Sequence, residues 1–471
     1  MGTTVLRPAG AGRIVVVGNG PAAHRLVERL RAHGHTGSIT VLGREEQPAY
    51  NRVLLGAVLD RTLSPETVAL PDVDAEVRLR VTATEIDRRR RVVRTDTGTE
   101  HEYDVLVLAT GARPTLPEIT GLRAEHLQPL RTLADCRRFD DVAGPLAVLG
   151  GGILGVEAAR ALLARGHRVT LVHPKPYPMD RQVDPAGGRL LAERLGKLGV
   201  ELRLGRRATA YRPGRLILDN SDVVPAELVV ACTGVVPETG LAVRAGLPVR
   251  RGVVVDDQLR TADPRIHAIG DCAEHNGDTP GLIASAWDQA DVLAAVLTGE
   301  DVRYRGTRTV TRLKARGIDL VSIGSVDGLD SAEAEVVTLS DPARGRYAKL
   351  ALREERIIGA VLFGLPEAIA SVSQLHDRDL PVPADRLALL LGTPAAMPGA
   401  PAELPDDAVI CRCNNVTKKA LTAAWQGGAR SVPELAGATR ATTGCGGCVD
   451  DVGRICAALA NRTDHEREGA A

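Results

Sequence analysis

Residues 13–23 read RIVVVGNGPAA, a run of β-branched residues that leads directly into a glycine-rich turn. Apolar residues then recur with helical spacing, and a second β-branched segment follows at 38–42. This order predicts a βαβ unit with a dinucleotide fingerprint of the form G-x-G-x-x-A. Gly18 permits the sharp turn, Gly20 lets the backbone approach a diphosphate, and Ala23 allows close packing of helix on strand. The N-terminus of the helix would face the phosphates with its partial positive charge.

The same pattern occurs a second time along the chain. A strand-like run at 146–149 precedes GGGILG at 150–155, and a helical segment at about 156–164 leads to another β-branched run at 168–172. One such motif alone is a weak signal. Two of them, each within its own βαβ unit, indicate two nucleotide-binding domains and two different nucleotides. We therefore expect an α/β fold with two Rossmann-like domains.

The remaining patterns predict a smaller domain and a separate module. Residues 75–87 and 91–96 are expected to form a hairpin, and further strands are expected at 200–204, 215–218, 227–231 and 266–269. From about 306 to 391, alternating strands and one helix near 367–376 predict a small α+β domain. Closely spaced prolines then form a semi-rigid linker, which precedes a small helical module that carries cysteines.

Composition excludes several classes of function. The 59 Lys and Arg residues balance 59 Asp and Glu residues, so no overall field draws the chain to nucleic acid or to anionic lipid. With only 2 Phe, 2 Trp and 6 Tyr, a stacking platform for single-stranded nucleic acid is not expected. No apolar run is long and unbroken enough to span a membrane, and no secretory signal is evident. We expect a cytoplasmic protein whose clustered thiols serve metal or redox chemistry.

Four of the 8 cysteines form two close pairs near the end of the chain, Cys411 with Cys413 and Cys445 with Cys448. Thr417 and a Ser-x-x-Glu capping box at 431–434 predict helices between the pairs, so both pairs are expected in loops at helix ends. Four thiolates suit a [2Fe–2S] cluster or a structural zinc. The single residue between the first two cysteines favours the cluster, because zinc pairs are usually spaced more widely.

The other four cysteines are scattered, and we expect them to be small buried hydrophobic residues: Cys136, Cys232, Cys272 and Cys456. No C-x-x-C or C-x4-C pattern lies beside the first glycine turn. The sequence therefore does not predict a redox-active disulfide like that of glutathione or lipoamide reductases.

Several further segments resemble one family. Residues 16–20 (VVGNG), 48–55 (PAYNRVLL) and 268–272 (AIGDC) resemble the FAD-dependent pyridine-nucleotide oxidoreductases. The likeness is to the N-terminal half of bacterial assimilatory nitrite reductase large subunits and to the electron-transfer subunit of bacterial assimilatory nitrate reductase. It continues at 179–184 (MDRQVD) and 311–314 (TRLK). The cysteine module is similar to [2Fe–2S] domains of the bacterioferritin-associated ferredoxin type.

The resemblance implies which residues hold FAD. The diphosphate would lie on Gly18, Gly20, Pro21 and Ala22, with Arg52 as a cationic partner. Glu45 is the acid expected to bond the adenosine ribose, and Asp271, beside Gly270, would bond the ribityl chain. Ala109, Thr110 and Gly111 resemble the segment that returns the chain from the FAD sheet. The alternatives are that Asp271 is only a helix cap and Arg52 only a surface cation.

The second unit would bind the nicotinamide dinucleotide through its glycine loop, with a companion turn at 232–234. The residues implied are Gly150, Gly152, Ile153, Leu154, Gly155 and Gly234. An NAD-specific site usually has an acid at the end of the next strand, where it bonds the ribose 2′-OH. This sequence has His173, Pro174 and Lys175 there. Nothing in that segment repels a 2′-phosphate, so the choice between NADH and NADPH stays open.

The resemblance implies an NAD(P)H-dependent FAD/[2Fe–2S] reductase that passes electrons to the catalytic subunit of assimilatory nitrate reductase. No acid–base pair is needed for hydride transfer, so no catalytic residue is predicted. Nitrite reductase large subunits have a sirohaem and [4Fe–4S] half with four further cysteines, and this sequence contains no such set. A separate nitrite reductase is the second candidate acceptor. Two other readings are the FAD and [2Fe–2S] subunit of an opine- or hydroxyproline-type dehydrogenase, which the intact second loop disfavours, and a zinc or redox-sensing docking module.

The expected domain boundaries combine the patterns with the resemblance. They are 1–115 with 243–305 for FAD, 116–242 for NAD(P), 306–392 for the α+β domain, 393–409 for the linker, 410–461 for the [2Fe–2S] domain and 462–471 for a polar tail.

Overall fold

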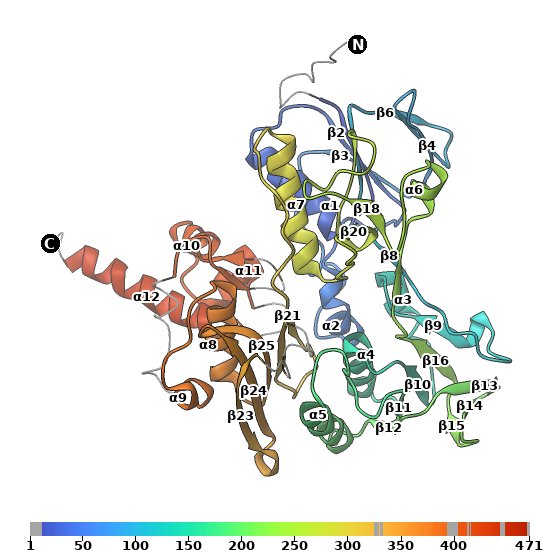
Figure 1. Ribbon diagram of the computed structural model, residues 1–471, viewed down its shortest axis with the longest axis vertical. Coiled ribbons are helices and arrows are strands. Elements are labelled where there is room, and N and C mark those ends of the chain that lie inside the picture. The colour runs from blue at the N-terminus through green and yellow to red at the C-terminus, as the bar shows by residue number, and fades with distance from the viewer. Residues whose placement is uncertain are drawn as a thin grey trace. The chain divides into compact units, whose positions relative to one another are not determined.

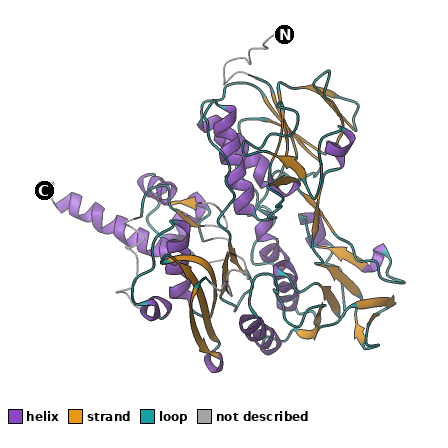
Figure 2. Cartoon of the chain, in the orientation of Figure 1, coloured by secondary structure: helices purple, strands orange, loops and turns teal. Residues whose placement is uncertain are grey.

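The computed structural model describes residues 12–324, 329, 333–392, 404–411, 414, 416–442 and 448–468. The chain divides into two compact units. The first unit comprises residues 1–52, 65–117 and 233–309, and the second comprises residues 53–64, 118–232 and 310–471. Each unit combines helices and strands (Figures 1 and 2).

The first unit is built on a parallel sheet whose strand order is β19-β7-β1-β2-β3. The strands are β1 (Ile14–Val17), β2 (Ile39–Gly43), β3 (Glu76–Leu79), β7 (Val105–Leu108) and β19 (Ile266–Ala268). Strand β1 is buried along its whole length, as its unbroken β-branched run predicts. Helix α1 (Pro21–Ala32) begins at the end of the glycine turn and packs against α7 (Ile283–Leu297).

The second unit contains a sheet of the same design, with the order β12-β11-β10-β16-β9 and parallel pairing throughout. Its strands are β9 (Leu127–Pro129), β10 (Leu146–Leu149), β11 (Val169–His173), β12 (Glu201–Leu204) and β16 (Leu228–Ala231). The second glycine loop connects β10 to α4 (Ile153–Ala164), and α5 (Pro185–Lys197) follows β11. The two Rossmann-like domains expected from the sequence are thus confirmed.

Small antiparallel sheets accompany both units. They are formed by β4 (Ala83–Asp87), β5 (Val92–Thr95) and β6 (Glu100–Glu102), by β13 (Ala208–Arg212), β14 (Arg215–Leu218) and β15 (Val223–Pro225), and by the antiparallel pair β8 (Ala112–Pro114) with β17 (Val235–Pro237). Strands β18 (Val253–Val255) and β20 (Ala273–His275) form a parallel pair. The single strand expected at 75–87 is wrong, because Arg80 has a φ of 58° and turns the chain between β3 and β4.

The α+β domain of the second unit has one antiparallel sheet, with the order β21-β22-β25-β24-β23. The strands are β21 (Val310–Arg312), β22 (Leu320–Gly324), β23 (Glu335–Asp341), β24 (Arg346–Arg353) and β25 (Arg356–Phe363). Helices α8 (Pro366–Asp377) and α9 (Arg386–Leu390) pack on it around a core that contains Leu350, Leu362 and Ile369.

The C-terminal module consists of β26 (Val409–Cys411), β27 (Val416–Thr417), α10 (Lys418–Gln426), α11 (Val432–Thr439) and α12 (Val449–Glu468). The predicted caps are confirmed: the side chain of Thr417 accepts the N–H of Ala420, and that of Ser431 accepts the N–H of Glu434. Helix α12 runs on to Glu468, through residues where a polar tail was expected. Of the predicted linker, residues 393–403 lie outside the described part of the chain.

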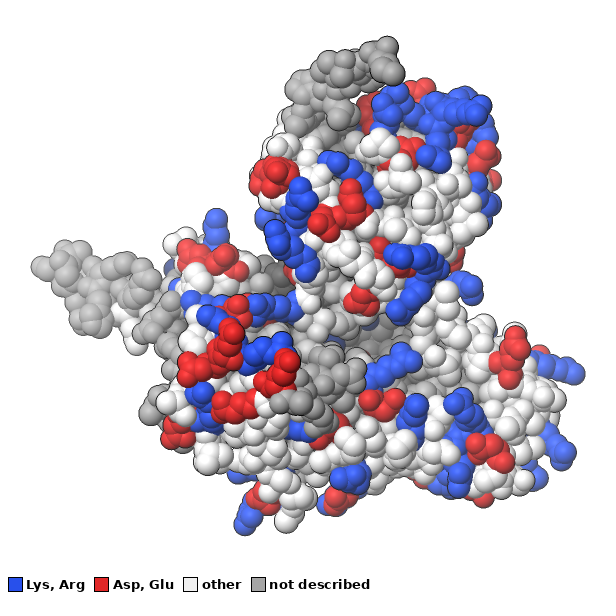
Figure 3. All heavy atoms as spheres, in the orientation of Figure 1, with Lys and Arg blue, Asp and Glu red and all other residues white. Residues whose placement is uncertain are grey.

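The remaining short helices are η1 (Arg52–Leu54), α2 (Leu55–Leu59), η2 (Ala124–His126), α3 (Leu133–Arg137), α6 (Gly240–Arg244), η3 (Gly270–Cys272) and η5 (Pro342–Arg344). None of the helices in the described residues combines the length and the apolar character that crossing a membrane requires. On the visible face of each unit, Lys and Arg are interspersed with Asp and Glu (Figure 3).

Candidate functional site

The first glycine turn contains two glycines with different roles. Gly18 has a φ of 115°, and a Cβ on it would lie 2.0 Å from the carbonyl oxygen of Ala109. Only glycine therefore fits where β7 passes this turn. Gly20 has no atom within 4 Å of the position that a Cβ would take. The fold requires the first glycine, and the second leaves open space that suits the close approach of a diphosphate.

Helix α1 begins directly behind this open space. Pro21 is its first residue, where a missing N–H costs no helical bond. Ala23 is completely buried at the position of the fingerprint's last small residue. A Cβ on Gly270 would lie 3.2 Å from the Cβ of Ala22. The structure therefore brings together two segments, at 18–22 and 270–271, that the resemblance assigns to FAD.

Arg52 stands at the centre of a charged cluster in the first unit. Its guanidinium pairs with the carboxylate of Glu45 and lies 4.6 Å from the ring centroid of Tyr50, whose hydroxyl donates to Glu45 at 2.7 Å. Burial opposes the charge of Arg52, but nearby Tyr50, Glu45 and Asp271 more than compensate, so the pKa of Arg52 is raised. Three of the predicted FAD residues, Glu45, Arg52 and Asp271, are thus close enough to interact. Because its side chain is only 22% exposed, Arg52 is not a simple surface cation.

The segment after β7 joins the parallel sheet to the antiparallel pair β8 and β17. Thr110 donates its hydroxyl to the carbonyl of Glu238 at 2.6 Å, and the N–H of Glu238 returns to the carbonyl of Gly111 at 2.8 Å. Gly111 and Gly234 both have positive φ values, of 71° and 103°. Gly234 belongs to the first unit, whereas the other residues predicted for the nicotinamide dinucleotide belong to the second.

The second glycine loop repeats the geometry of the first. A Cβ on Gly155 would lie 1.7 Å from the carbonyl oxygen of Gly150, so glycine is required where α4 meets β10. Gly152, like Gly20, has no atom within 4 Å of its Cβ position. Ile153 and Leu154 form the first turn of α4, whose backbone N–H groups have no partner within the helix. This loop also fits a diphosphate.

His173 ends strand β11 beneath this loop. Its Nδ1 accepts the backbone N–H of Gly151 at 3.0 Å, which assigns the ring proton to Nε2, and Nε2 lies 2.9 Å from Oδ1 of Asp180. Burial lowers the pKa of His173, although Asp180 counteracts part of this effect. The residue at the end of this strand is therefore an imidazole whose two ring nitrogens both have partners.

Two of the four predicted cluster ligands lie in the described residues. Cys411 ends β26 and Cys448 immediately precedes α12, and both are buried. The N–H of Thr442 donates to Sγ of Cys448 at 3.3 Å, the type of contact that stabilises a thiolate or a cluster sulfur. Cys413 and Cys445 lie outside the described residues. Within the described part of the chain, no three side chains of the metal-binding types gather.

The scattered cysteines mostly behave as expected. Cys136, Cys232 and Cys272 are buried, and burial raises the pKa of Cys136 and of Cys232 to about 12. These thiols are neutral and poor nucleophiles. Cys456, by contrast, is only half-buried in α12, so the expectation of burial is wrong there.

Sequence reasoning missed two residues near these sites. Tyr50 connects Arg52 to Glu45, and nothing in its spacing indicates this. Glu157 lies buried in α4, where Oε1 accepts the backbone N–H of Lys314 at 2.8 Å and lies 3.8 Å from its Nζ. A single carboxylate within the otherwise apolar face of this helix was the available signal.

The chain matches known families over most of its length. Residues 12–290 match the family described as pyridine nucleotide-disulphide oxidoreductase, residues 310–375 match the rubredoxin NAD+ reductase C-terminal domain, and residues 409–458 match the BFD-like [2Fe-2S] binding domain. The first match implies FAD and NAD(P)H as cofactors, and the last implies a [2Fe–2S] cluster.

Two relatives illustrate the similarity. The chain is 33% identical over 457 residues to the nitrite reductase [NAD(P)H] of Bacillus subtilis (strain 168), covering 93% of this chain and 56% of the relative. It is 32% identical over 454 residues to the assimilatory nitrate reductase electron transfer subunit of the same organism, covering 93% and 58%. It thus spans little more than half the length of these relatives.

A solved structure of a covalent putidaredoxin reductase–putidaredoxin complex matches with a TM-score of 0.73 and 26% identity, over 82% of this chain and 97% of that one. Both glycine loops lie within the matched family segment. The chain therefore belongs to the pyridine nucleotide-disulphide oxidoreductase family, as an NAD(P)H-linked flavoprotein with a C-terminal [2Fe–2S]-binding domain.

Proposed function

We propose that this chain is an NAD(P)H-dependent reductase component that delivers electrons to the catalytic subunit of an assimilatory nitrate reductase. The observation that carries the proposal is the paired geometry of the two glycine loops, with open space at Gly20 and at Gly152, in one chain with a [2Fe–2S]-binding domain. The similarity to an assimilatory nitrate reductase electron transfer subunit supports this acceptor.

In this proposal, residues of the first unit hold FAD. Gly18, Gly20, Pro21 and Ala22 surround the diphosphate, and Arg52 balances its charge while Glu45 remains available as an acceptor for the ribose. Gly270 and Asp271 bond the ribityl chain, while Ala109, Thr110 and Gly111 fix the returning backbone. When bound, FAD would accept a hydride, which is a proton with two electrons, and could then release the two electrons one at a time.

Residues of the second unit hold the nicotinamide dinucleotide. Gly150, Gly152 and Gly155 shape the loop, and the first turn of α4 at 153–154 supplies N–H groups to the phosphates. The assignment of Gly234 to a companion turn stays a prediction from the sequence. Because hydride transfer needs correct placement and no proton relay, we assign no acid or base.

Cys411, Cys413, Cys445 and Cys448 are our proposed cluster ligands. The buried positions of Cys411 and Cys448 and the N–H contact from Thr442 fit an anionic cluster. Residues 410–461 also contain six Lys and Arg residues against three Asp and Glu residues. The domain boundaries stated from the sequence remain part of this proposal. A cytoplasmic location stays a prediction from the sequence.

A second candidate acceptor is a separate nitrite reductase, which the similarity to a nitrite reductase [NAD(P)H] favours. The alternative of an opine- or hydroxyproline-type dehydrogenase subunit, in which no nicotinamide dinucleotide binds, is disfavoured by the second glycine loop, which has open space at Gly152. A zinc-binding module would be excluded by finding two irons and two acid-labile sulfides per chain.

An anaerobic titration with NADH and NADPH tests the proposal. Both the flavin and the cluster absorbance should bleach, and adding the nitrate-reducing subunit with nitrate should restore the oxidised spectra. Cys448→Ser should keep NAD(P)H-to-dye turnover and abolish electron delivery to that subunit. Cys456→Ser, a change of the same type eight residues away in the same module, should leave both activities intact. Equal loss of dye and subunit reduction in Cys448→Ser, or a flavin that NAD(P)H does not bleach, would refute the proposed route.

A further inference from the structure

The choice between NADH and NADPH depends on the groups that surround the adenosine ribose 2′ position. In Rossmann-like domains this position lies beyond the end of the second strand, where an acid bonds a 2′-OH and a cation binds a 2′-phosphate. In this chain that strand is β11, and the residue at its end is His173. A histidine therefore stands where an NAD-specific site usually has a carboxylate. Both nitrogens of its ring already have partners, namely Gly151 and Asp180.

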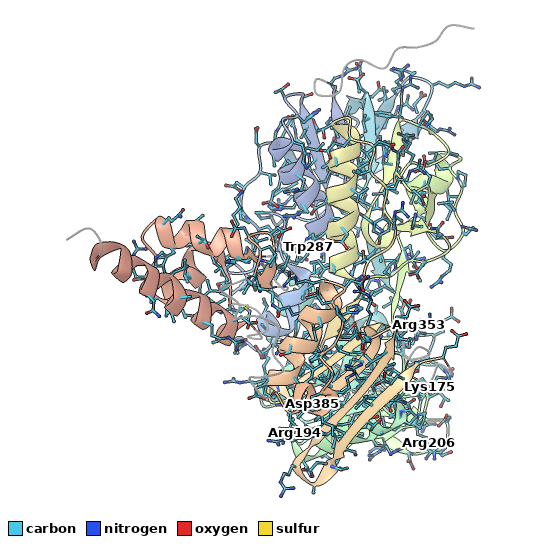
Figure 4. All side chains as sticks on the ribbon, turned by 60° about the vertical axis from the view of Figure 1, so that its left-hand side comes forward. Lys175, Arg194, Arg206, Trp287, Arg353 and Asp385 are labelled. Carbon is cyan, nitrogen blue, oxygen red and sulfur yellow. The ribbon has the colours of Figure 1, made fainter. Side chains whose placement is uncertain are left out.

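Two cations emerge next to His173 from adjacent turns. Strands β11 and β12 are parallel neighbours, and His173 is in register with Leu204. Just past their ends, the N–H of Gly205 donates to the carbonyl of Lys175 at 2.9 Å, and the N–H of Arg206 donates to the carbonyl of His173 at 3.1 Å. These two bonds hold the turns together, so Lys175 and Arg206 leave the same edge of the sheet. Figure 4 shows both on the same side of the domain.

The charges of this pair are available to a ligand. Lys175 and Arg206 are both exposed, and within the described residues neither side chain forms an ion pair. The acid beside this edge is Asp180, and the Nε2–H of His173 engages its carboxylate. A ribose hydroxyl gains little from two unpaired cations, whereas a phosphate dianion forms charge-assisted hydrogen bonds with both.

We propose that the second nucleotide-binding domain selects NADPH over NADH, with Lys175 and Arg206 binding the 2′-phosphate. This inference rests on the proposed placement of the nicotinamide dinucleotide at the second glycine loop. The lysine supplies a point charge, and the planar guanidinium supplies two parallel N–H donors to one phosphate. His173 acts as a positioning residue, because its bond to Gly151 fixes the loop against the strand end from which the two turns start.

Direct binding of two adenosine fragments tests the inference without turnover. Using the full chain loaded with its flavin and cluster, isothermal titration calorimetry would compare 2′,5′-ADP with 5′-AMP. We expect 2′,5′-ADP to bind at least about tenfold more tightly, since a charge-assisted hydrogen bond contributes on the order of that factor. Lys175→Ala and Arg206→Ala should each reduce this ratio, and the double variant should bring it near one without changing the affinity for 5′-AMP.

Arg215→Ala is the matched control, because it removes an exposed arginine from β14, on a separate sheet of the same unit. It should leave the ratio unchanged. In steady-state dye reduction, the double variant should raise KM for NADPH but not for NADH, at unchanged kcat. Added salt should reduce the wild-type preference and not that of the double variant.

The outcomes separate this inference from the proposed function. Equal binding of the two fragments by the wild type would overturn NADPH selection and leave the electron-transfer proposal standing. Equal loss of both fragments in the double variant would mean a structural effect and would also overturn the assignment. If neither fragment bound, the placement of the nucleotide at this loop would fail as well.

Discussion

The carboxylate of Glu157 accepts the backbone N–H of Lys314 at 2.8 Å, which connects helix α4 of the second nucleotide-binding domain to the α+β domain. Burial raises the pKa of Glu157, although the charge of Lys314 counteracts part of this effect. The buried N–H of Lys314 needs an acceptor, and Glu157 supplies it. This hydrogen bond therefore stabilises the junction between two domains of the second unit.

Replacing Glu157 should therefore destabilise the second unit. Glu157→Ala leaves the N–H of Lys314 without its acceptor and should cost about 1–3 kcal/mol, whereas Glu157→Gln keeps an acceptor oxygen and should cost less. Hydrogen exchange of peptides from α4, measured by mass spectrometry, would report both. Glu193→Ala on α5, which removes an exposed carboxylate from the same unit, should have almost no effect. Equal exchange in Glu157→Ala and Glu193→Ala would contradict this prediction.

The raised pKa of Glu157 also gives a pH dependence with a defined sign. Its folded state holds a proton more tightly than the unfolded state, for which the ordinary value is 4.5. The second unit should therefore lose stability as pH rises from this value towards the folded pKa, and the slope should end above it. In Glu157→Gln this contribution should disappear. A pH profile of unfolding that is identical in the two proteins would argue against the raised pKa.

Because of His267, we expect the stability of the first unit to depend on pH in the opposite direction. Burial lowers its pKa from 6.5 to about 4, and its Nδ1 has no hydrogen-bond partner. The folded state binds fewer protons than the unfolded state between these values, so stability is fully present above pH 6.5 and is lost as pH falls towards 4. The protection of β19 amides against hydrogen exchange, taken relative to the intrinsic exchange rate at each pH, should therefore decrease as pH falls over this range in the wild type. In His267→Leu the dependence should be much flatter, whatever the absolute stability of the variant.

The glycines of the first turn should respond differently to alanine. Gly18→Ala combines a positive φ with a 2.0 Å clash against the Ala109 carbonyl, so the first unit should lose stability even without FAD. Gly20→Ala meets no protein atom within 4 Å, so the apoprotein should fold normally while its affinity for FAD falls. Flavin content and apoprotein melting would distinguish the two. Gly196→Ala, in α5 with equally open surroundings, should retain flavin. Normal FAD affinity in Gly20→Ala would contradict the proposed diphosphate site.

The features predicted best from the sequence were those with strong local signals. The unbroken run at 14–17 and the glycine turn after it gave β1 and α1, because a buried parallel strand needs continuous apolar residues and the turn needs positive φ. The capping residues Thr417 and Ser431 were also identified, since an N-cap bond spans only a few residues.

The features that were missed depend on contacts distant in sequence or on backbone strain. The division of 75–87 into β3 and β4 depends on Arg80 adopting a positive φ, which arginine rarely does. The contact between Glu157 and Lys314 joins residues of different domains, so no local pattern encodes it. The convergence of Lys175 and Arg206 likewise requires the register of β11 and β12, whereas the sequence showed Lys175 alone.

The cluster around Arg52 gives the last prediction. Arg52→Lys keeps the charge but loses the planar donors and the stacking on Tyr50, and Arg52→Ala also removes the cation that pairs with the half-buried Glu45. Retained flavin should therefore decrease in the order wild type, Arg52→Lys, Arg52→Ala. Tyr50→Phe keeps the ring under the guanidinium but removes the hydroxyl's hydrogen bonds with Glu45 and with Arg52, so it should retain more flavin than Arg52→Ala. Arg25→Ala, which breaks an ion pair between α1 and α7 in the same unit, controls for general loss of stability. If Arg52→Ala and Arg25→Ala released flavin to the same extent, Arg52 would stabilise the fold alone and the assignment of its charge to the diphosphate would be wrong.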